Sequence, residues 1–265
     1  MILSENRFPL FGIMLESKHM TVEWISYQAG GKRFVGALVY DERVAGKRPL
    51  LLMAPNWLGV TEEAIQRTQM MAGTHFIGFV ADMYGDGKVS AGPPESAQLA
   101  DALRADPKER RHRIGAALAT LIRESDKRGI GDASRKAAVG FCFGGGNVLE
   151  LARAGADLQA AISLHGDLTS LMPAEPGDIK AALLVAHGAA DPAVPKAQRD
   201  AFEAEMEAAK ASWQMLTFGH LVHSFSEPEA DVPGLAEYNE EAARQTYRLI
   251  DQFIADAFAG HVVRK

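Results

Sequence analysis

The chain has 265 residues, of which 47% are hydrophobic and 23% are charged, and its formal net charge at pH 7 is −6. This composition excludes a disordered, a collagen-like or a disulfide-stapled chain, and the acidic balance argues against nucleic acid or a membrane as a partner. The single cysteine, Cys142, permits no disulfide within the chain and is typical of a reducing compartment, so we expect a cytoplasmic protein.

We divide the chain into an N-terminal arm and one domain. Residues 1–20 show no periodic pattern, and we interpret them as an N-terminal arm that is either a tag remnant or an upstream start. Residues 21–265 are expected to form one domain, because large α/β sheets often reach this length as a single unit. The expected assembly is a monomer or a homodimer.

Apolar runs with strand character alternate with segments of helical period from Thr21 onward, which is typical of βαβ units and a mostly parallel sheet. The eight expected strands are 22–27, 33–39, 49–54, 76–81, 136–141, 159–164, 181–187 and 213–218. The inner strands are continuously apolar, as strands covered by helices on both faces should be. The sequence therefore predicts an α/β fold of about eight strands with helices on both faces.

Helix and turn signals fit this arrangement. Thr61 is expected to cap a helix that ends at Gly73, Pro195 to open a second helix, and a stripe of apolar residues from Ala243 to Ile254 to mark the last one. The first two strands are joined by a short connection with glycines at 29–32, so the sheet should begin with an antiparallel hairpin.

The segment Lys136–Gly146 is the most informative for function. It reads as a strand, then Gly140-Phe141-Cys142-Phe143-Gly144, then a helix, which is the GxSxG nucleophile elbow with cysteine in place of serine. In such a turn, side chains two places on either side of the nucleophile would collide, and this explains glycine at 140 and 144. The alternative is that Cys142 is a small buried hydrophobic residue at a tight turn.

An acid and then a histidine follow the nucleophile in enzymes with this elbow. Asp191 comes after the strand at 181–187, and His223 comes after the strand at 213–218, so both are expected at the edge of the sheet where Cys142 lies. Asp191 would orient the imidazole, and His223 would pair with the thiolate. His220 is the main alternative to His223. The HxxH spacing of the two histidines also permits a metal site, although no third ligand is specified.

An oxyanion hole requires two backbone N–H groups that point at the developing negative charge. One is expected from Phe143, directly after the nucleophile, and the other from Trp57 in the loop after the third strand. Three further residues on loops after strands are candidate walls of the substrate pocket, with ordinary packing as the alternative for each: Asn56, Tyr84 and His165.

Five motifs in order give the chain a specific resemblance: PNWLGV (55–60), ADMYG (81–85), GFCFGGG (140–146), HGAADPAVP (187–195) and HSFSEPEAD (223–231). With these motifs the chain resembles the dienelactone hydrolase family of the α/β-hydrolase fold. The resemblance implies hydrolysis of an ester or a lactone by a catalytic triad of Cys142, Asp191 and His223, with no cofactor and no metal.

The sequence departs from the best-known members of that family at three positions. Those enzymes carry a glutamate that contacts the thiol where this chain has Asn56, and they hold a substrate carboxylate with two arginines where the matching positions are Asp86 and Glu227. We therefore expect a hydrolase for an ester, lactone or thioester other than dienelactone itself. Two other functions stay open at this point. They are a non-catalytic or regulatory small-molecule-binding protein and a thiol-based redox protein, for which the chain offers no resolving cysteine.

Overall fold

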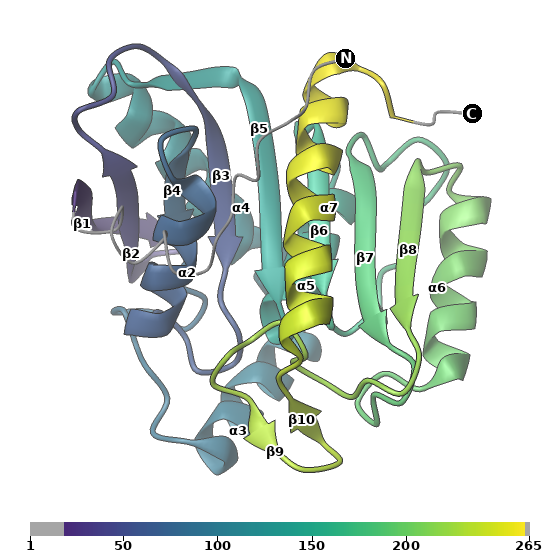
Figure 1. Ribbon diagram of the computed structural model, residues 1–265. Coiled ribbons are helices and arrows are strands. Elements are labelled where there is room, and N and C mark those ends of the chain that lie inside the picture. Colours follow the sequence, from purple (N-terminus) through teal and green to yellow (C-terminus); the bar gives the residue numbers. More distant parts are fainter. Residues whose placement is uncertain (1–18, 263–265) are drawn as a thin grey trace.

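A mixed sheet of eight strands forms the centre of the molecule, in the order β1-β2-β4-β3-β5-β6-β7-β8 (Figure 1). The computed structural model describes residues 19–262. The strands are β1 (Met20–Ala29), β2 (Lys32–Asp41), β3 (Arg48–Ala54), β4 (Ile77–Val80), β5 (Gly131–Phe141), β6 (Ala160–Leu164), β7 (Ala182–Gly188) and β8 (Trp213–Phe218). All eight expected strands are present, and the predicted α/β fold is confirmed.

One strand of the sheet, β2, runs opposite to the other seven. β1 pairs antiparallel with β2 and β2 antiparallel with β4, whereas every pair from β4 to β8 is parallel. The first hairpin closes at the pair Ala29 and Lys32, and the two residues between them, Gly30 and Gly31, both have positive φ. This two-residue turn matches the twist of the strands, so the expected antiparallel start is confirmed.

Helices cover both faces of the sheet (Figure 1). On one face lie α2 (Glu62–Ala72) and α7 (Glu240–Ala259), and on the other lie α3 (Pro93–Arg104), α4 (Pro107–Lys127), α5 (Phe143–Arg153) and α6 (Lys196–Ala208). The central strands contribute to both cores. In β3, for example, Leu50 and Leu52 pack in the core with α4 and α5, while Leu51 and Met53 pack in the core with α2 and α7. This two-sided burial explains why the inner strands are continuously apolar.

Two helices and a small hairpin differ from the sequence-based expectation. α3 and α4 fill a stretch to which we assigned no helix. The segment after Glu227, to which we assigned no strand, contains a small hairpin of β9 (Asp231–Val232) and β10 (Ala236–Glu237). The arm expected at 1–20 lies outside the described residues except for His19 and Met20, and Met20 already belongs to β1.

The parallel strands bring their carboxyl ends to one edge of the sheet, and the loops that follow them carry the candidate site residues. In Figure 1 this edge is at the bottom, between α3 and the hairpin of β9 and β10. Among residues 19–262, no helix has the length and apolar character needed to span a lipid bilayer.

Candidate active site

Cys142 lies between the last residue of β5 and the first residue of α5, with φ of 51°. This left-handed conformation is uncommon for a residue with a side chain and marks a sharp turn. The turn requires the flanking glycines. A Cβ at Gly140 would lie well under 3.0 Å from the carbonyl oxygen of Gly144, and a Cβ at Gly144 would lie equally close to that of Ala54. The steric reason given for glycine at both positions is therefore present in the structure.

The turn leaves Cys142 at the N-terminus of an entirely buried helix. Every residue of α5 is buried, while Cys142 itself is half-buried and its thiol is free of any disulfide. The N–H groups of the first helical turn point toward the residue that precedes the helix, and their partial positive charge stabilises an anion there. The sulfur therefore lies at the positive end of the α5 dipole.

His223 and Asp191 come together on the loops after β8 and β7. The His223 Nδ1 atom lies 2.8 Å from the Asp191 Oδ2 atom, and the other carboxylate oxygen accepts a hydrogen bond from the Ala193 backbone N–H at 2.8 Å. Asp191 is 3% exposed. Cys142 lies close enough to the ring of His223 to act on its pKa, so the ring lies between the acid and the thiol. His220, the alternative histidine, is exposed at the end of β8.

The electrostatics of this group favour the imidazolium form of His223. Burial acts to lower the pKa of His223, but the negative charge of Cys142 and the hydrogen bond that His223 donates to Asp191 outweigh it and raise the pKa to about 11. Burial likewise opposes ionisation of Asp191, yet the hydrogen bond from His223 leaves the pKa of this carboxyl below its ordinary value. The arrangement can therefore hold a negative sulfur, a positive ring and a negative carboxylate in a row.

His165 lies behind the candidate triad and not on a pocket wall, because it has no exposed surface. Its Nδ1 atom accepts a hydrogen bond of 3.2 Å from the Cys142 backbone N–H, and its Nε2 atom lies 2.9 Å from the Ser226 hydroxyl. Its ring meets that of His223 edge-on, with centroids 5.2 Å apart. Burial holds the pKa of His165 well below its usual range, so the ring is neutral. The expectation of a pocket wall is corrected to that of a support for Cys142 and His223.

The loop after β3 approaches the elbow and carries the expected second oxyanion donor. Asn56 Oδ1 accepts from the Leu58 backbone N–H at 3.0 Å, which folds the loop back on itself. Tyr84 donates its hydroxyl to the Trp57 carbonyl at 2.9 Å, and its ring stacks on that of Phe143 with centroids 5.8 Å apart. Burial raises the pKa of Tyr84, so the hydroxyl remains a donor. Tyr84 thus links the two residues expected to supply the oxyanion amides.

A buried ion pair between Arg67 and Glu227 holds the Asn56 side chain in place. This pair was not identified from the sequence. Glu227 Oε1 accepts hydrogen bonds from Asn56 Nδ2 at 2.7 Å and from Arg67 Nη1 at 3.1 Å, and Oε2 accepts from the Ser224 hydroxyl at 2.9 Å. Arg67 also pairs with Glu229 at 2.8 Å. The network ties the oxyanion loop, the histidine loop and α2 together. The signal in the sequence that could have revealed the network is Arg67, an arginine on the buried face of α2.

Two arginines surround Phe143 on the other side of the site. The guanidinium groups of Arg104 and Arg110 lie 5.4 and 5.2 Å from the centroid of its ring, and both pair with Asp167. Burial acts to lower the pKa of Arg104, but the nearby carboxylates, led by Asp167, and the charge of Cys142 raise it. Arg104 is therefore a cation close to the candidate nucleophile, and it is already paired with acids.

Comparison with known proteins identifies relatives over most of the chain. Residues 35–258 match the sequence pattern of the dienelactone hydrolase family. A solved structure named m3DLH is 33% identical, with a TM-score of 0.83, over 91% of this chain and 99% of its own. A dienelactone hydrolase-like promiscuous phosphotriesterase from metagenomic libraries is also 33% identical, with a TM-score of 0.81, over 90% of this chain and 99% of its own. An uncharacterized protein of Caenorhabditis elegans is 35% identical over 133 residues, which cover 48% of this chain and 84% of that protein.

Proposed function

Since the chain belongs to the dienelactone hydrolase family, we propose that it hydrolyses a carboxylic ester, lactone or thioester through a triad of Cys142, His223 and Asp191. The observation that supports this most directly is the position of His223, whose Nδ1 atom lies 2.8 Å from the Asp191 carboxylate and whose pKa is raised by the nearby Cys142. Nucleophile, base and orienting acid in this order are the parts that acyl transfer requires.

In the first half of the reaction, the Cys142 thiolate attacks the carbonyl carbon of the substrate and a carbon–sulfur bond forms. The resulting oxyanion accepts hydrogen bonds from the backbone N–H groups of Trp57 and Phe143. The N–H of Phe143 is suited to this, because the first residue of α5 has no partner for it within the helix. The carbon–oxygen bond then breaks, and His223 gives its proton to the leaving alkoxide.

In the second half, water replaces the leaving group. Neutral His223 takes a proton from the water, and the hydroxide attacks the carbon of the acyl-enzyme. The carbon–sulfur bond breaks and releases the acid, and the thiolate is left paired with the imidazolium of His223. Asp191 stabilises this cation in both halves of the cycle. His165 and Asn56 act through the groups that they hold, since His165 supports the Cys142 amide and Asn56 folds the oxyanion loop.

The test compares the wild type with Cys142→Ala and Cys142→Ser on p-nitrophenyl acetate, a neutral ester. We expect Cys142→Ala to lower kcat/KM by about 10⁴-fold or more, because the covalent route is lost. Wild-type enzyme quenched during turnover should gain the mass of one acetyl group on Cys142, the only cysteine in the chain. Wild-type turnover by Cys142→Ala would overturn the assignment of Cys142 as nucleophile, and a wild type without turnover on esters and lactones would favour a non-catalytic binding protein on this fold.

The substrate is proposed to be neutral near the scissile bond. Asp86 lies at the surface and pairs with Arg33 at 3.2 Å, while Glu227 is buried and engaged by Asn56 and Arg67. Neither position offers a guanidinium to a substrate carboxylate. A matched pair of phenyl acetate and its para-carboxylate should therefore be hydrolysed with kcat/KM favouring the uncharged ester by about tenfold. A clear preference for the carboxylate would instead point to Arg104.

A further inference from the structure

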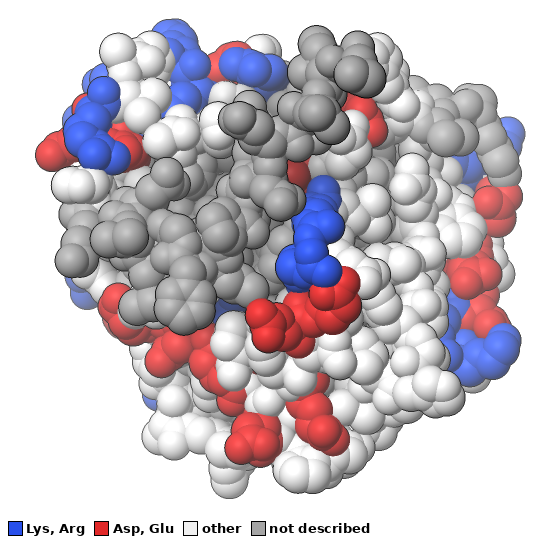
Figure 2. Space-filling view, viewed as in Figure 1, with Lys and Arg blue, Asp and Glu red and all other residues white. Residues whose placement is uncertain are grey.

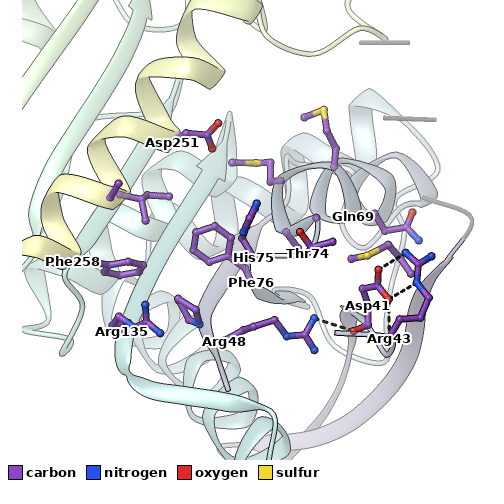
Figure 3. Close-up of a pocket in the computed structure, with 18 residues that line it drawn as sticks. Asp41, Arg43, Arg48, Gln69, Thr74, His75, Phe76, Arg135, Asp251 and Phe258 are labelled. Atoms are coloured by element: carbon purple, nitrogen blue, oxygen red, sulfur yellow. Dashed lines mark hydrogen bonds and ion pairs between the residues drawn. The ribbon is translucent and has the colours of Figure 1, made fainter. Parts of the chain in front are cut away.

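A second cavity lies at the opposite edge of the sheet from Cys142. It has a volume of about 740 Å³ and is bounded by the first residues of β3, the end of β2, the C-terminal part of α2 and the last turns of α7 (Figure 3). β3 begins at this cavity and ends beside the elbow, so seven residues separate the two sites. At the rise of an extended strand this corresponds to about 20 Å. The cavity is large enough for a small organic ligand.

Arg48, the first residue of β3, lines this cavity and has an unsatisfied hydrogen-bonding edge. It is 5% exposed, and its Nη1 atom donates to the Asp41 carbonyl at 3.0 Å. Its Nε and Nη2 atoms are buried and have no hydrogen-bond partner. These two groups lie on the same side of the planar guanidinium and form the fork that binds a carboxylate or a phosphate through two parallel hydrogen bonds. A buried donor without a partner is costly, and here both donors of one fork are unpaired.

The side chain of Asp41, whose backbone carbonyl accepts from Arg48, is already engaged. Both carboxylate oxygens of Asp41 are bound by Arg43, at 2.9 Å from Nε and 2.5 Å from Nη2. Arg135, at another part of the wall, pairs with Asp132 at 2.7 Å. Arg48 therefore supplies a positive charge that Asp41 does not neutralise by a side-chain bond, and Figure 3 shows its side chain reaching between the other lining residues toward Asp41.

Most of the remaining wall is apolar, and its other polar residues are Gln69, Thr74, His75 and Asp251. Apolar side chains come from β1, α2, the residue before β4, and α7: Met20, Met70, Met71, Phe76, Ile254 and Phe258. Figure 3 shows Phe76 and Phe258 on the side of the cavity that faces α7. A ligand that fills such a space has an apolar body and one anionic end. A hydrated inorganic ion would leave the apolar part of the wall without contacts.

We propose that this cavity binds an amphiphilic carboxylate, such as a medium-chain fatty acid or an aryl-alkanoic acid. Its carboxylate accepts hydrogen bonds from Nε and Nη2 of Arg48, and its apolar part packs against Phe76, Ile254 and Phe258. The site is separate from the active site and does not depend on the proposed function. Occupation would stabilise the folded protein by mass action.

The test uses the methyl signals of the three methionines that line the cavity. Full-length Cys142→Ala protein, labelled with [methyl-13C]methionine, is titrated with octanoate, with octan-1-ol and with inorganic phosphate. Cys142→Ala removes turnover as a source of signal changes. We expect saturable shifts of Met20, Met70 and Met71 with octanoate, at a Kd on the order of a millimolar for a ligand of this size. Octan-1-ol and phosphate should each bind about tenfold more weakly.

Arg48→Lys and Arg48→Met identify the group that holds the carboxylate. Lysine keeps the charge and loses the fork, so we expect about a tenfold weaker Kd for octanoate, and methionine should weaken it further. If either variant fails to fold, the comparison of octanoate with octan-1-ol on the protein that retains Arg48 still tests the proposal. Unchanged methionine signals, equal affinity for the acid and the alcohol, or undiminished binding by a folded Arg48→Met variant would each overturn the proposal. Shifts produced by phosphate as readily as by octanoate would contradict the amphiphilic ligand.

Discussion

The loops after β6 and β8 each bring a histidine to the same edge of the sheet, yet the two rings have opposite electrostatics. His165 has no exposed surface, and burial lowers its pKa far enough to keep it neutral. Burial acts on His223 in the same direction, but Cys142 and Asp191 raise its pKa to about 11. The centroids of the two rings are 5.2 Å apart. Their contrast shows that ionised neighbours, and not depth in the protein, decide which imidazole carries the proton.

Of the substitutions that test this contrast, replacement of His223 should lower the activity most. His223→Gln removes the cation that pairs with the sulfur and the acid that protonates the leaving group. We expect kcat/KM for p-nitrophenyl acetate to fall by about 10³- to 10⁴-fold. His165→Gln is the matched control at the neighbouring ring. Equal losses in both variants would break the contrast between the two histidines.

Asp191→Asn should follow, with a loss of about 10²- to 10³-fold in kcat/KM. An amide in place of the carboxylate no longer stabilises the imidazolium and can bind the wrong tautomer of His223. The reaction with p-nitrophenyl acetate measures this loss. Asp200→Asn on the exposed face of α6, where Asp200 pairs with Lys196, is the control and should stay within about twofold of the wild type. A mild effect at Asp191 would mean that Cys142 alone keeps His223 protonated.

His165→Gln should cost about tenfold in kcat/KM, because the Cys142 amide loses one of two acceptors and keeps the Leu164 carbonyl at 3.0 Å. The pH profile of kcat/KM distinguishes support from proton transfer. Since His165 is neutral, the profile of this variant should keep the wild-type midpoints. A displaced midpoint would show that His165 shares the catalytic proton.

Glu227→Gln should affect stability more than turnover. The substitution leaves the buried Arg67 with only Glu229 as a charged partner, so we expect a loss of about 2–4 kcal/mol in the free energy of unfolding and a fall of only a few-fold in kcat/KM. Urea unfolding and the ester assay measure the two effects. Glu229→Gln, at the half-exposed end of the same network, should cost less than about 1 kcal/mol. Equal costs at both positions would contradict a buried role for Glu227.

The dependence of stability on pH gives the smallest signal. The pKa of His223 is raised from 6.5 to about 11, so its contribution to stability is fully present below 6.5 and is lost as the pH rises through 11. Without Cys142 one cause of that rise disappears. In Cys142→Ala the loss should therefore occur at lower pH than in the wild type, as measured by urea unfolding between pH 6 and pH 10. Parallel pH curves would mean that Cys142 does not carry the charge.

The fold and the candidate triad could be predicted because local rules specify them. Continuous apolar runs predict buried strands, and the steric needs of the turn at Cys142 require Gly140 and Gly144. The order of Asp191 and His223 after parallel strands then places both at one edge. All of these signals lie within a few residues of each other in the sequence or follow from sheet topology.

The supporting residues could not be predicted in this way. The contact between Asn56 and Glu227 joins positions 171 apart, and that between Arg67 and Glu227 joins positions 160 apart. Either glutamate or arginine alone is typical of an exposed loop or helix face. His165 was expected on a pocket wall because it follows a strand. Its φ of 40° instead turns it inward beneath Cys142, and nothing in its sequence neighbourhood signals that conformation.

The rate of Cys142 alkylation by iodoacetamide tests the central claim most directly, because this reagent reacts with the thiolate and the chain has one cysteine. The rate is measured in wild type and in His223→Gln at pH 6 and at pH 10. We predict that at pH 6 the wild type reacts about tenfold or more faster than His223→Gln, and that the two rates converge at pH 10. Equal rates at pH 6 would contradict the account, since the imidazolium of His223 would then not stabilise the Cys142 thiolate.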